Sequence, residues 1–142
     1  MIKKKVLLNY GSQNLNNLNF KKISQNLIQQ TITNGNNCLK FEKNICKLTN
    51  SKFAVVCNNG TSALMMSILS LNIKNPIVII PNINFVASSS ILALMKAKII
   101  LCDVNVKTGM VDETCLISIL KKCKNKKIKP NLFIPIHYAG DI

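Results

Sequence analysis

From residue 53 onward, short continuous hydrophobic runs alternate with longer segments of helical spacing. The short runs predict strands, because strands buried on both faces read as unbroken, β-branched apolar stretches. These runs are Phe53–Cys57, Ile77–Ile80, Ile99–Cys102 and Leu132–Ile136. The intervening segments are each long enough for about three helical turns, and they are Thr61–Leu71, Val86–Lys96 and Glu113–Lys122. The order β-α-β-α-β-α-β predicts an α/β fold, a mostly parallel sheet with crossover helices.

The first 50 residues have a different character. They are rich in asparagine and show two helical patterns, Leu18–Gln30 and Cys38–Leu48, separated by the turn-prone Thr33-Asn34-Gly35-Asn36. We interpret residues 1–50 as a helical N-terminal arm and residues 51–142 as an incomplete α/β domain. The first two helices expected in that domain are apolar nearly all round, so we expect them to pack under layers of protein that this chain alone does not supply.

The charge raises a binding function as an alternative. The chain has 19 basic and 5 acidic residues and a formal net charge of +14. Every basic residue is a lysine, the lysines are spread along the chain, and arginine, which supplies bidentate phosphate and guanine contacts, is absent. We therefore favour a solvated lysine surface and expect no nucleic-acid partner. A non-catalytic basic α/β module that binds nucleic acid or another protein stays open as the alternative.

No targeting or metal-binding signal is evident. The apolar run after Lys3-Lys4-Lys5 is too short for a signal peptide, and each longer apolar stretch is broken by Asn, Ser or Lys. We expect a cytoplasmic protein without a membrane segment. The six cysteines show no CxxC spacing, so we expect buried, reduced thiols and no metal site.

The segment Cys57-Asn58-Asn59-Gly60-Thr61-Ser62 could bind an anion. A strand is expected to end there and a helix to begin directly, so free backbone N–H groups, the positive end of the helix dipole and two hydroxyls would lie together. Gly60 would let a ligand approach the backbone closely. The alternative is an ordinary capped helix, since Asn, Gly, Thr and Ser are common N-cap residues. A phosphate seat and a plain cap both fit this pattern.

Two further candidates follow other expected strands, at the edge where ligands of parallel α/β sheets gather. Phe85 follows the second strand, where its ring could stack on a flat cofactor or instead belong to the core. His137, the only histidine, follows the fourth strand. It could contact a cofactor or substrate or act as acid or base, but it could also be a structural group.

An ordered set of segments adds a family resemblance. Tyr10-Gly11-Ser12-Gln13 and the turn at Thr31–Gly35 are followed by CNNGTSALMMSILSL, PNINFVASSS, CDVN with TGMVD, and PIHYAGD. This set resembles the DegT/DnrJ/StrS family of pyridoxal 5′-phosphate-dependent nucleotide-sugar aminotransferases, over nearly the whole chain. The resemblance implies the N-terminal part of the large domain of the aspartate-aminotransferase fold (fold type I).

The resemblance also implies roles for individual residues. Gly60, Thr61 and Ser62 match the turn that binds the cofactor phosphate, and Phe85 matches the aromatic residue that stacks on the pyridine ring. Tyr10 and Thr33 match the arm that lines the substrate entrance, often facing a partner subunit. His137 matches a frequent His of the family and is placed with the substrate-side residues. Asn58-Asn59 departs from the family's commoner Ser-Asn or Asn-Ser.

The implied activity of the full-length protein is two-step transamination of a nucleotide-linked keto-sugar, with glutamate as the expected donor and a homodimer as the expected assembly. Within the family the chain is most similar to enzymes that aminate a UDP-linked 4-keto-6-deoxy-hexosamine on the route to pseudaminic acid. A sugar dehydratase, in which a histidine replaces the cofactor-linking lysine, is the alternative. That lysine is expected beyond Ile142, so we assign no catalytic residue here and expect the chain to be an inactive fragment.

Overall fold

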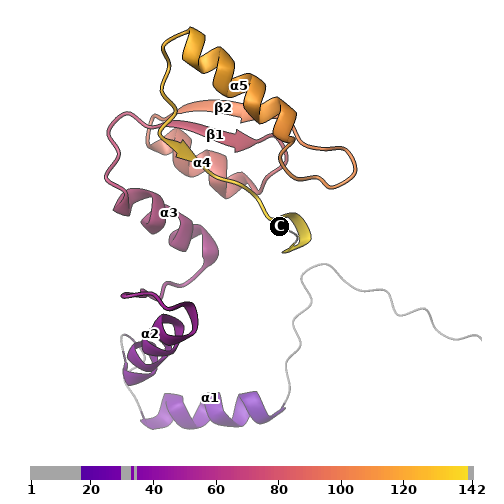
Figure 1. Ribbon diagram of the computed structural model, residues 1–142. Helices are drawn as coiled ribbons and strands as arrows, with labels where there is room; N and C mark the ends of the chain where they lie inside the picture. The colour runs from indigo at the N-terminus through magenta and orange to yellow at the C-terminus, as the bar shows by residue number, and fades with distance from the viewer. Residues whose placement is uncertain (1–16, 30–32, 34, 141–142) are drawn as a thin grey trace, which may run out of the picture. The chain divides into compact units, whose positions relative to one another are not determined.

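The structure is a computed structural model, and it describes residues 17–29, 33 and 35–140. The chain divides into two compact units, residues 1–56 and 57–142, which are described separately. Within its described residues the second unit contains helices on both faces of a small sheet (Figure 1).

The sheet has three parallel strands in the order β2-β1-β3. They are β1 (Ile77–Pro81), β2 (Lys98–Cys102) and β3 (Leu132–Phe133). Val78 pairs with Ile99 on one side and with Leu132 on the other. Because β1 has a neighbour on both edges and is buried from Val78 to Pro81, it is the centre of this unit. The expected parallel sheet is thereby confirmed.

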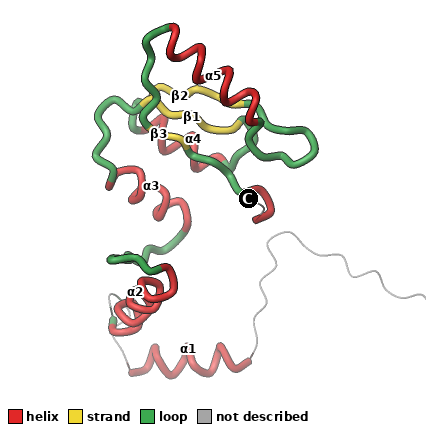
Figure 2. The backbone as a smooth tube through the Cα atoms, viewed as in Figure 1, coloured by secondary structure: helices red, strands yellow, loops and turns green. Residues whose placement is uncertain are grey.

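Helices cover both faces of the sheet, as the tube in Figure 2 also shows. Side chains alternate along a strand, so Val78 and Ile80 point to one face and Ile79 to the other. On the first face the core combines one residue of α3 (Gly60–Ser70), two of β1 and three of α4 (Val86–Leu94), namely Ile68, Val78, Ile80, Ala87, Ile91 and Leu92. Helix α5 (Glu113–Asn125) lies on the opposite face, and its residue Cys123 is buried.

The first unit contains two helices, α1 (Asn17–Gln29) and α2 (Asn36–Thr49). Helix α2 ends at Asn50 in the left-handed conformation (φ 52°), and the Ser51 N–H donates to the Cys46 carbonyl at 3.0 Å. This is the usual way to satisfy the last carbonyls of a helix. Both helices lie where the sequence patterns place them.

One expected strand is absent. Residues 53–57 form no strand, although the run Phe-Ala-Val-Val-Cys is β-branched and apolar. A strand needs a ladder partner, and the one hydrogen bond found for this backbone segment is from the Val56 N–H to Glu42 Oε1, at 3.0 Å. The expectation for Phe53–Cys57 was therefore wrong for this structure, and the strand expected at Leu132–Ile136 is confirmed only at its first two residues.

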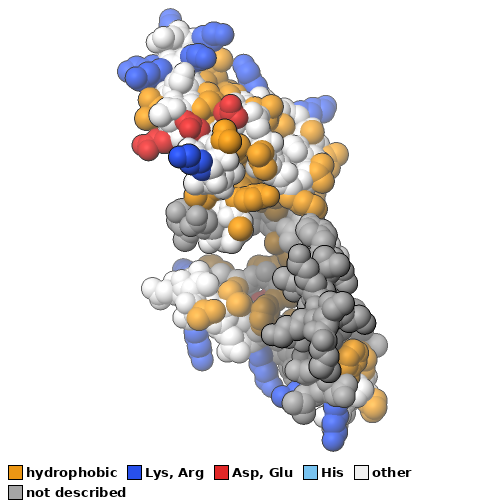
Figure 3. All heavy atoms as spheres, turned by 90° about the vertical axis from the view of Figure 1, so that its right-hand side faces the viewer, with side chains coloured by type: hydrophobic (Ala, Val, Ile, Leu, Met, Phe, Trp, Pro, Cys, Tyr) orange, Lys and Arg blue, Asp and Glu red, His pale blue; other side chains and the backbone are white. Residues whose placement is uncertain are grey.

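Much apolar surface of the sheet-containing unit is open to solvent. In helix α3 only Ile68 is buried, while Met65, Met66 and Leu69 are exposed. Figure 3 shows hydrophobic side chains along the visible face of this unit, with lysines gathered at one end. This agrees with the expectation that α3 and α4 require further covering protein. In the part of the chain that the structure describes, no helix combines the length and apolarity that a membrane crossing requires.

Candidate functional site

The start of helix α3 leaves two backbone donors without partners. Asn59 is the N-cap residue, and its side-chain Oδ1 accepts a hydrogen bond from the Ser62 N–H at 2.8 Å. Its carbonyl accepts from the Ala63 N–H at 3.1 Å. The N–H groups of Gly60 and Thr61 donate to no described residue. Amides of a first helical turn have no partner within the helix, so these two are open to a ligand.

The side chains at the same turn are equally open. Gly60 and Thr61 are exposed and Ser62 is partly buried, and neither hydroxyl takes part in a hydrogen bond within the described residues. A Cβ added to Gly60 would meet no atom within 4 Å, and its φ is not positive, so neither packing nor backbone conformation of the described chain requires glycine there. An anion approaching these amides would need that open space. The turn therefore fits a phosphate group, with Asn59 holding the helix start in place.

Phe85 lies at the carboxyl end of the central strand, in the loop from β1 to α4. It is the N-cap residue of α4, and its carbonyl accepts a hydrogen bond from the Ser88 N–H at 3.0 Å. The side chain is 69% exposed, so the hypothesis that Phe85 belongs to the core is not supported in the described chain. An exposed ring beside a strand end can serve as a flat surface for an aromatic ligand. Helices α3 and α4 contact each other, so the two helices that begin at these features belong to one packed layer.

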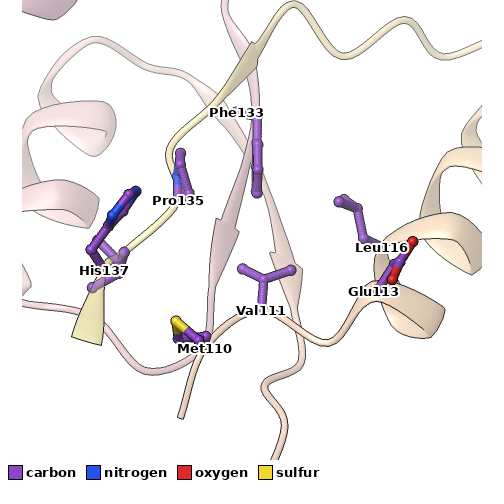
Figure 4. A pocket seen from close by; sticks show the side chains of 8 residues that line it. Met110, Val111, Glu113, Leu116, Phe133, Pro135 and His137 are labelled. Carbon is purple, nitrogen blue, oxygen red and sulfur yellow. The ribbon is translucent and has the colours of Figure 1, made fainter. Parts of the chain in front are cut away.

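His137 lies beside a pocket of about 290 Å³ between α5 and the segment that follows β3. The pocket is mostly apolar and is lined by Met110, Val111, Glu113, Leu116, Phe133, Pro135, Ile136 and His137. Figure 4 shows His137 and Glu113 on opposite sides of it, and no hydrogen bond joins them. The imidazole therefore lacks a carboxylate partner within the described part of the chain. The geometry provides an accessible histidine, without an oriented acid–base pair.

The segment around His137 is held by a contact with the loop between β2 and α5. Gly109 has φ +71°, and a Cβ built on it would lie 3.3 Å from Cδ1 of the Tyr138 ring. The left-handed conformation favours glycine at position 109, and the Tyr138 ring would have to shift slightly to admit a larger residue there. Ala139 also adopts a positive φ of 56°, and the Gly140 N–H donates to the His137 carbonyl at 3.1 Å. These features fix the backbone that carries His137.

The remaining sequence candidates are Tyr10 and Thr33. Tyr10 lies outside the described residues. Thr33 is an exposed residue of a bend in the first unit. The roles suggested for Tyr10 and Thr33 at a substrate entrance stay predictions.

Electrostatic effects are concentrated at the β2–α5 connection. Asp112 caps α5, and hydrogen bonds from the Thr114 hydroxyl and from the Cys115 N–H lower the pKa of its carboxyl group. Burial, together with the neighbouring Cys115 thiol, raises the pKa of Cys102 to about 11. All six cysteines are free thiols, of which Cys102 and Cys123 are buried and the others are partly exposed. In the described ranges no group of His, Cys, Asp and Glu side chains is arranged to bind a metal ion.

The sequence interpretation included one structurally important asparagine and omitted another. Asn59 belongs to the cap-like pattern Asn-Gly-Thr-Ser, and its side chain does form the N-cap of α3. Asn84 was passed over, and its side-chain Nδ2 donates to the Pro81 carbonyl at 2.6 Å. Asparagine is a common turn residue, and this general preference is the only sequence signal for it.

Comparisons with known proteins agree on one group. Over 120 residues the chain is 28% identical to the UDP-4-amino-4,6-dideoxy-N-acetyl-beta-L-altrosamine transaminase of Campylobacter jejuni serotype O:2, covering 84% of this chain and 32% of that protein. The chain therefore spans about a third of the length of this relative.

Solved structures show the same fold. An aminotransferase from Psychrobacter cryohalolentis matches with a TM-score of 0.75 and 24% identity, over 91% of this chain and 32% of that one. The E. coli GDP-4-keto-6-deoxy-D-mannose-3-dehydratase, solved with bound hydrated PLP, matches with a TM-score of 0.66 and 24% identity, over 78% of this chain and 29% of that one.

The match to a family is the broadest of these findings. Residues 13–142 match the sequence profile described as the DegT/DnrJ/EryC1/StrS aminotransferase family, which is nearly all of the chain. The parallel sheet, the exposed first turn of α3 and the exposed ring of Phe85 are consistent with this match. The chain belongs to the DegT/DnrJ/EryC1/StrS aminotransferase family.

Proposed function

We propose that this chain forms the cofactor-phosphate seat of a pyridoxal 5′-phosphate-dependent enzyme that transfers an amino group to a nucleotide-linked keto-sugar. The observation that carries the proposal is the first turn of α3, where two amides and two hydroxyls make no hydrogen bond to any described residue and the space beside Gly60 is open. Membership of the aminotransferase family supports a cofactor phosphate as that anion. When bound, the cofactor provides the electron sink that transamination needs.

The residues of this chain would have separate tasks in binding. The Gly60 and Thr61 amides and the Thr61 and Ser62 hydroxyls would hold the phosphate dianion, supported by the positive end of the α3 dipole. Phe85 would offer its exposed ring face to the cofactor ring. Asn59 would keep the first turn formed by holding the Ser62 N–H. None of these groups transfers a proton, so they would bind and orient the cofactor and leave the chemical step to other residues.

We further propose that the sugar is a UDP-linked 4-keto-6-deoxy-hexosamine, that glutamate is the amino donor, and that the enzyme acts as a homodimer. The name of the Campylobacter relative supports the substrate class. The sugar 3-dehydratase among the structural matches keeps cofactor-dependent dehydration as a second candidate. The two differ in whether the full-length protein carries a lysine or a histidine at the cofactor-linking position, so its cofactor absorption after borohydride treatment separates them. Borohydride fixation of the cofactor to a lysine supports transamination.

The phosphate seat is tested by removing both hydroxyls from the full-length gene product. The double variant Thr61→Val with Ser62→Ala loses two hydrogen bonds to a charged group, so its cofactor dissociation constant should rise on the order of 100-fold. The matched control is Ser67→Ala with Ser70→Ala in the same helix, whose hydroxyls donate to helix carbonyls at 2.8 and 2.7 Å. The control should bind as tightly as the unchanged protein. Equal affinities for both double variants would remove the start of α3 as the phosphate site.

A further inference from the structure

The loop that leads from the central strand to α4 is closed by one side chain. Asn84 is partly buried, and its Nδ2 donates to the carbonyl of Pro81 at 2.6 Å. Pro81 is the last residue of β1 and is fully buried. A carbonyl oxygen only accepts hydrogen bonds, so the amide nitrogen of Asn84 must face it, and the orientation of the carboxamide is fixed. This hydrogen bond therefore attaches the loop to the buried last residue of β1.

Phe85 directly follows Asn84, and a hydrogen bond on its C-terminal side holds its backbone as well. Its carbonyl accepts the Ser88 N–H at 3.0 Å as α4 begins. Its φ and ψ of −73° and 137° are extended, which points the chain out of the strand before the helix starts. The ring itself is 69% exposed. Phe85 thus has a constrained backbone under a side chain that the described protein barely covers.

We propose that Asn84 is a positioning residue that holds the ring of Phe85 ready for the cofactor ring, an inference that rests on the proposed function. A loop that is already ordered loses less conformational freedom on binding than one that must be ordered by the ligand. The bond from Asn84 to Pro81 provides this order in advance. Without it, the residues between β1 and α4 would sample several conformations, and only some of them would present the ring face.

The alternative role of Asn84 is general stabilisation, since it also satisfies a buried carbonyl. The two roles differ in their dependence on Phe85. A positioning residue acts on cofactor affinity only while the ring is present. A residue that merely stabilises the loop affects the protein equally with or without that ring. A double-mutant cycle between Asn84 and Phe85 therefore separates them.

The experiment uses the apo form of the full-length gene product, titrated with pyridoxal 5′-phosphate and followed by absorbance and by the circular dichroism of the bound cofactor. Asn84→Ala should raise the dissociation constant about fivefold, the effect of one net hydrogen bond, and should reduce the induced dichroism. Asn82→Ala is the matched control, because Asn82 is exposed in the same loop and only its backbone N–H is bonded, to Cys102 at 2.8 Å. It should leave the affinity unchanged.

In the Phe85→Ala background, Asn84→Ala should change the affinity less than twofold. An equal loss in both backgrounds, or no loss from Asn84→Ala while Phe85→Ala weakens binding, overturns the positioning role and leaves the proposed function standing. If Phe85→Ala binds the cofactor with unchanged affinity, the ring does not stack on the cofactor. The stacking role of Phe85 and the positioning role of Asn84 are then both wrong.

If Asn84→Ala does not fold, the less disruptive variant Asn84→Ser is used in its place. Serine keeps a hydroxyl that can donate a hydrogen bond, on a side chain shorter than that of asparagine. Asn84→Ser should therefore fold and bind with intermediate affinity. If it also fails to fold, Asn84 is a structural residue and the inference is wrong.

Discussion

A change of Asn59 to aspartate should separate the stability of helix α3 from its ability to bind an anion. Asp caps helices as well as Asn does, so the bond to the Ser62 N–H is kept. A negative charge at a helix N-terminus adds about 0.3–1 kcal/mol of stability. The apo form of Asn59→Asp should thus be at least as stable as the unchanged protein, whereas Asn59→Ala should lose about 1 kcal/mol.

Cofactor binding should change in the opposite direction. A phosphate held by the Gly60 and Thr61 amides would lie roughly 6 Å from the new carboxylate, and it carries about −1.5 to −2 charges at neutral pH. Repulsion at an effective dielectric constant of about 40–80 is then about 1–2.8 kcal/mol, so the dissociation constant should rise about 5- to 100-fold. The control is Asn75→Asp, which makes the same charge change in an exposed turn beyond the other end of α3.

The assay is cofactor titration of the full-length apo protein at about 0.1 M and about 1 M salt, paired with urea unfolding of the apo forms. The affinity difference should shrink at the higher salt, where the Debye length falls from about 10 to 3 Å. Unchanged affinity of Asn59→Asp at low salt would show that no anion binds at this turn. An Asn59→Asp protein less stable than Asn59→Ala would refute the capping argument.

Two further predictions concern the ionisable side chains of Asp112 and Cys102, near α5. The hydrogen bonds from Thr114 and Cys115 lower the pKa of Asp112 below 3.8, so its stabilising effect is complete above that value and is lost as the pH falls through the lowered pKa. Urea unfolding should show the stability gap between the unchanged protein and Asp112→Asn narrowing below about pH 4, and a constant gap would contradict this. Cys102, with a pKa of about 11, is roughly one-thousandth thiolate at pH 8. Peptide mass mapping should find it alkylated by iodoacetamide well after the partly exposed Cys57, and equal rates would count against its burial.

The fold could be predicted where a local sequence signal and the burial of the segment indicate the same element. Ile77–Ile80 reads as a fully buried strand and is one, and Asp112 and Asn59 stand where helix starts are expected. The run Phe53–Cys57 has strand composition, but pairing is a property of two segments, and its composition could not reveal that the described chain offers no ladder partner. In the same way, the exposure of Phe85 depends on what covers it, which its own sequence neighbourhood does not state.

The candidate site was predictable in part for a similar reason. The Asn-Gly-Thr-Ser pattern indicates a helix start, and helix starts have fixed donor geometry, so the open amides follow from the sequence. The contact of Tyr138 with Gly109 joins residues from two loops, and its discovery required coordinates. The hydrogen bond from Asn84 to Pro81 spans only three residues, but turn preferences indicate an asparagine in a loop without specifying which carbonyl it bonds.

The central position of β1 has a consequence for the timescales of motion in this unit. A strand with neighbours on both sides can lose its hydrogen bonds only when the sheet opens as a whole, so its amide protons should be among the slowest to exchange with solvent. The loop that carries Phe85 begins at the end of that strand. The loop that would present an aromatic ring to a ligand is thereby anchored at one end to the part of the unit whose amides should exchange most slowly.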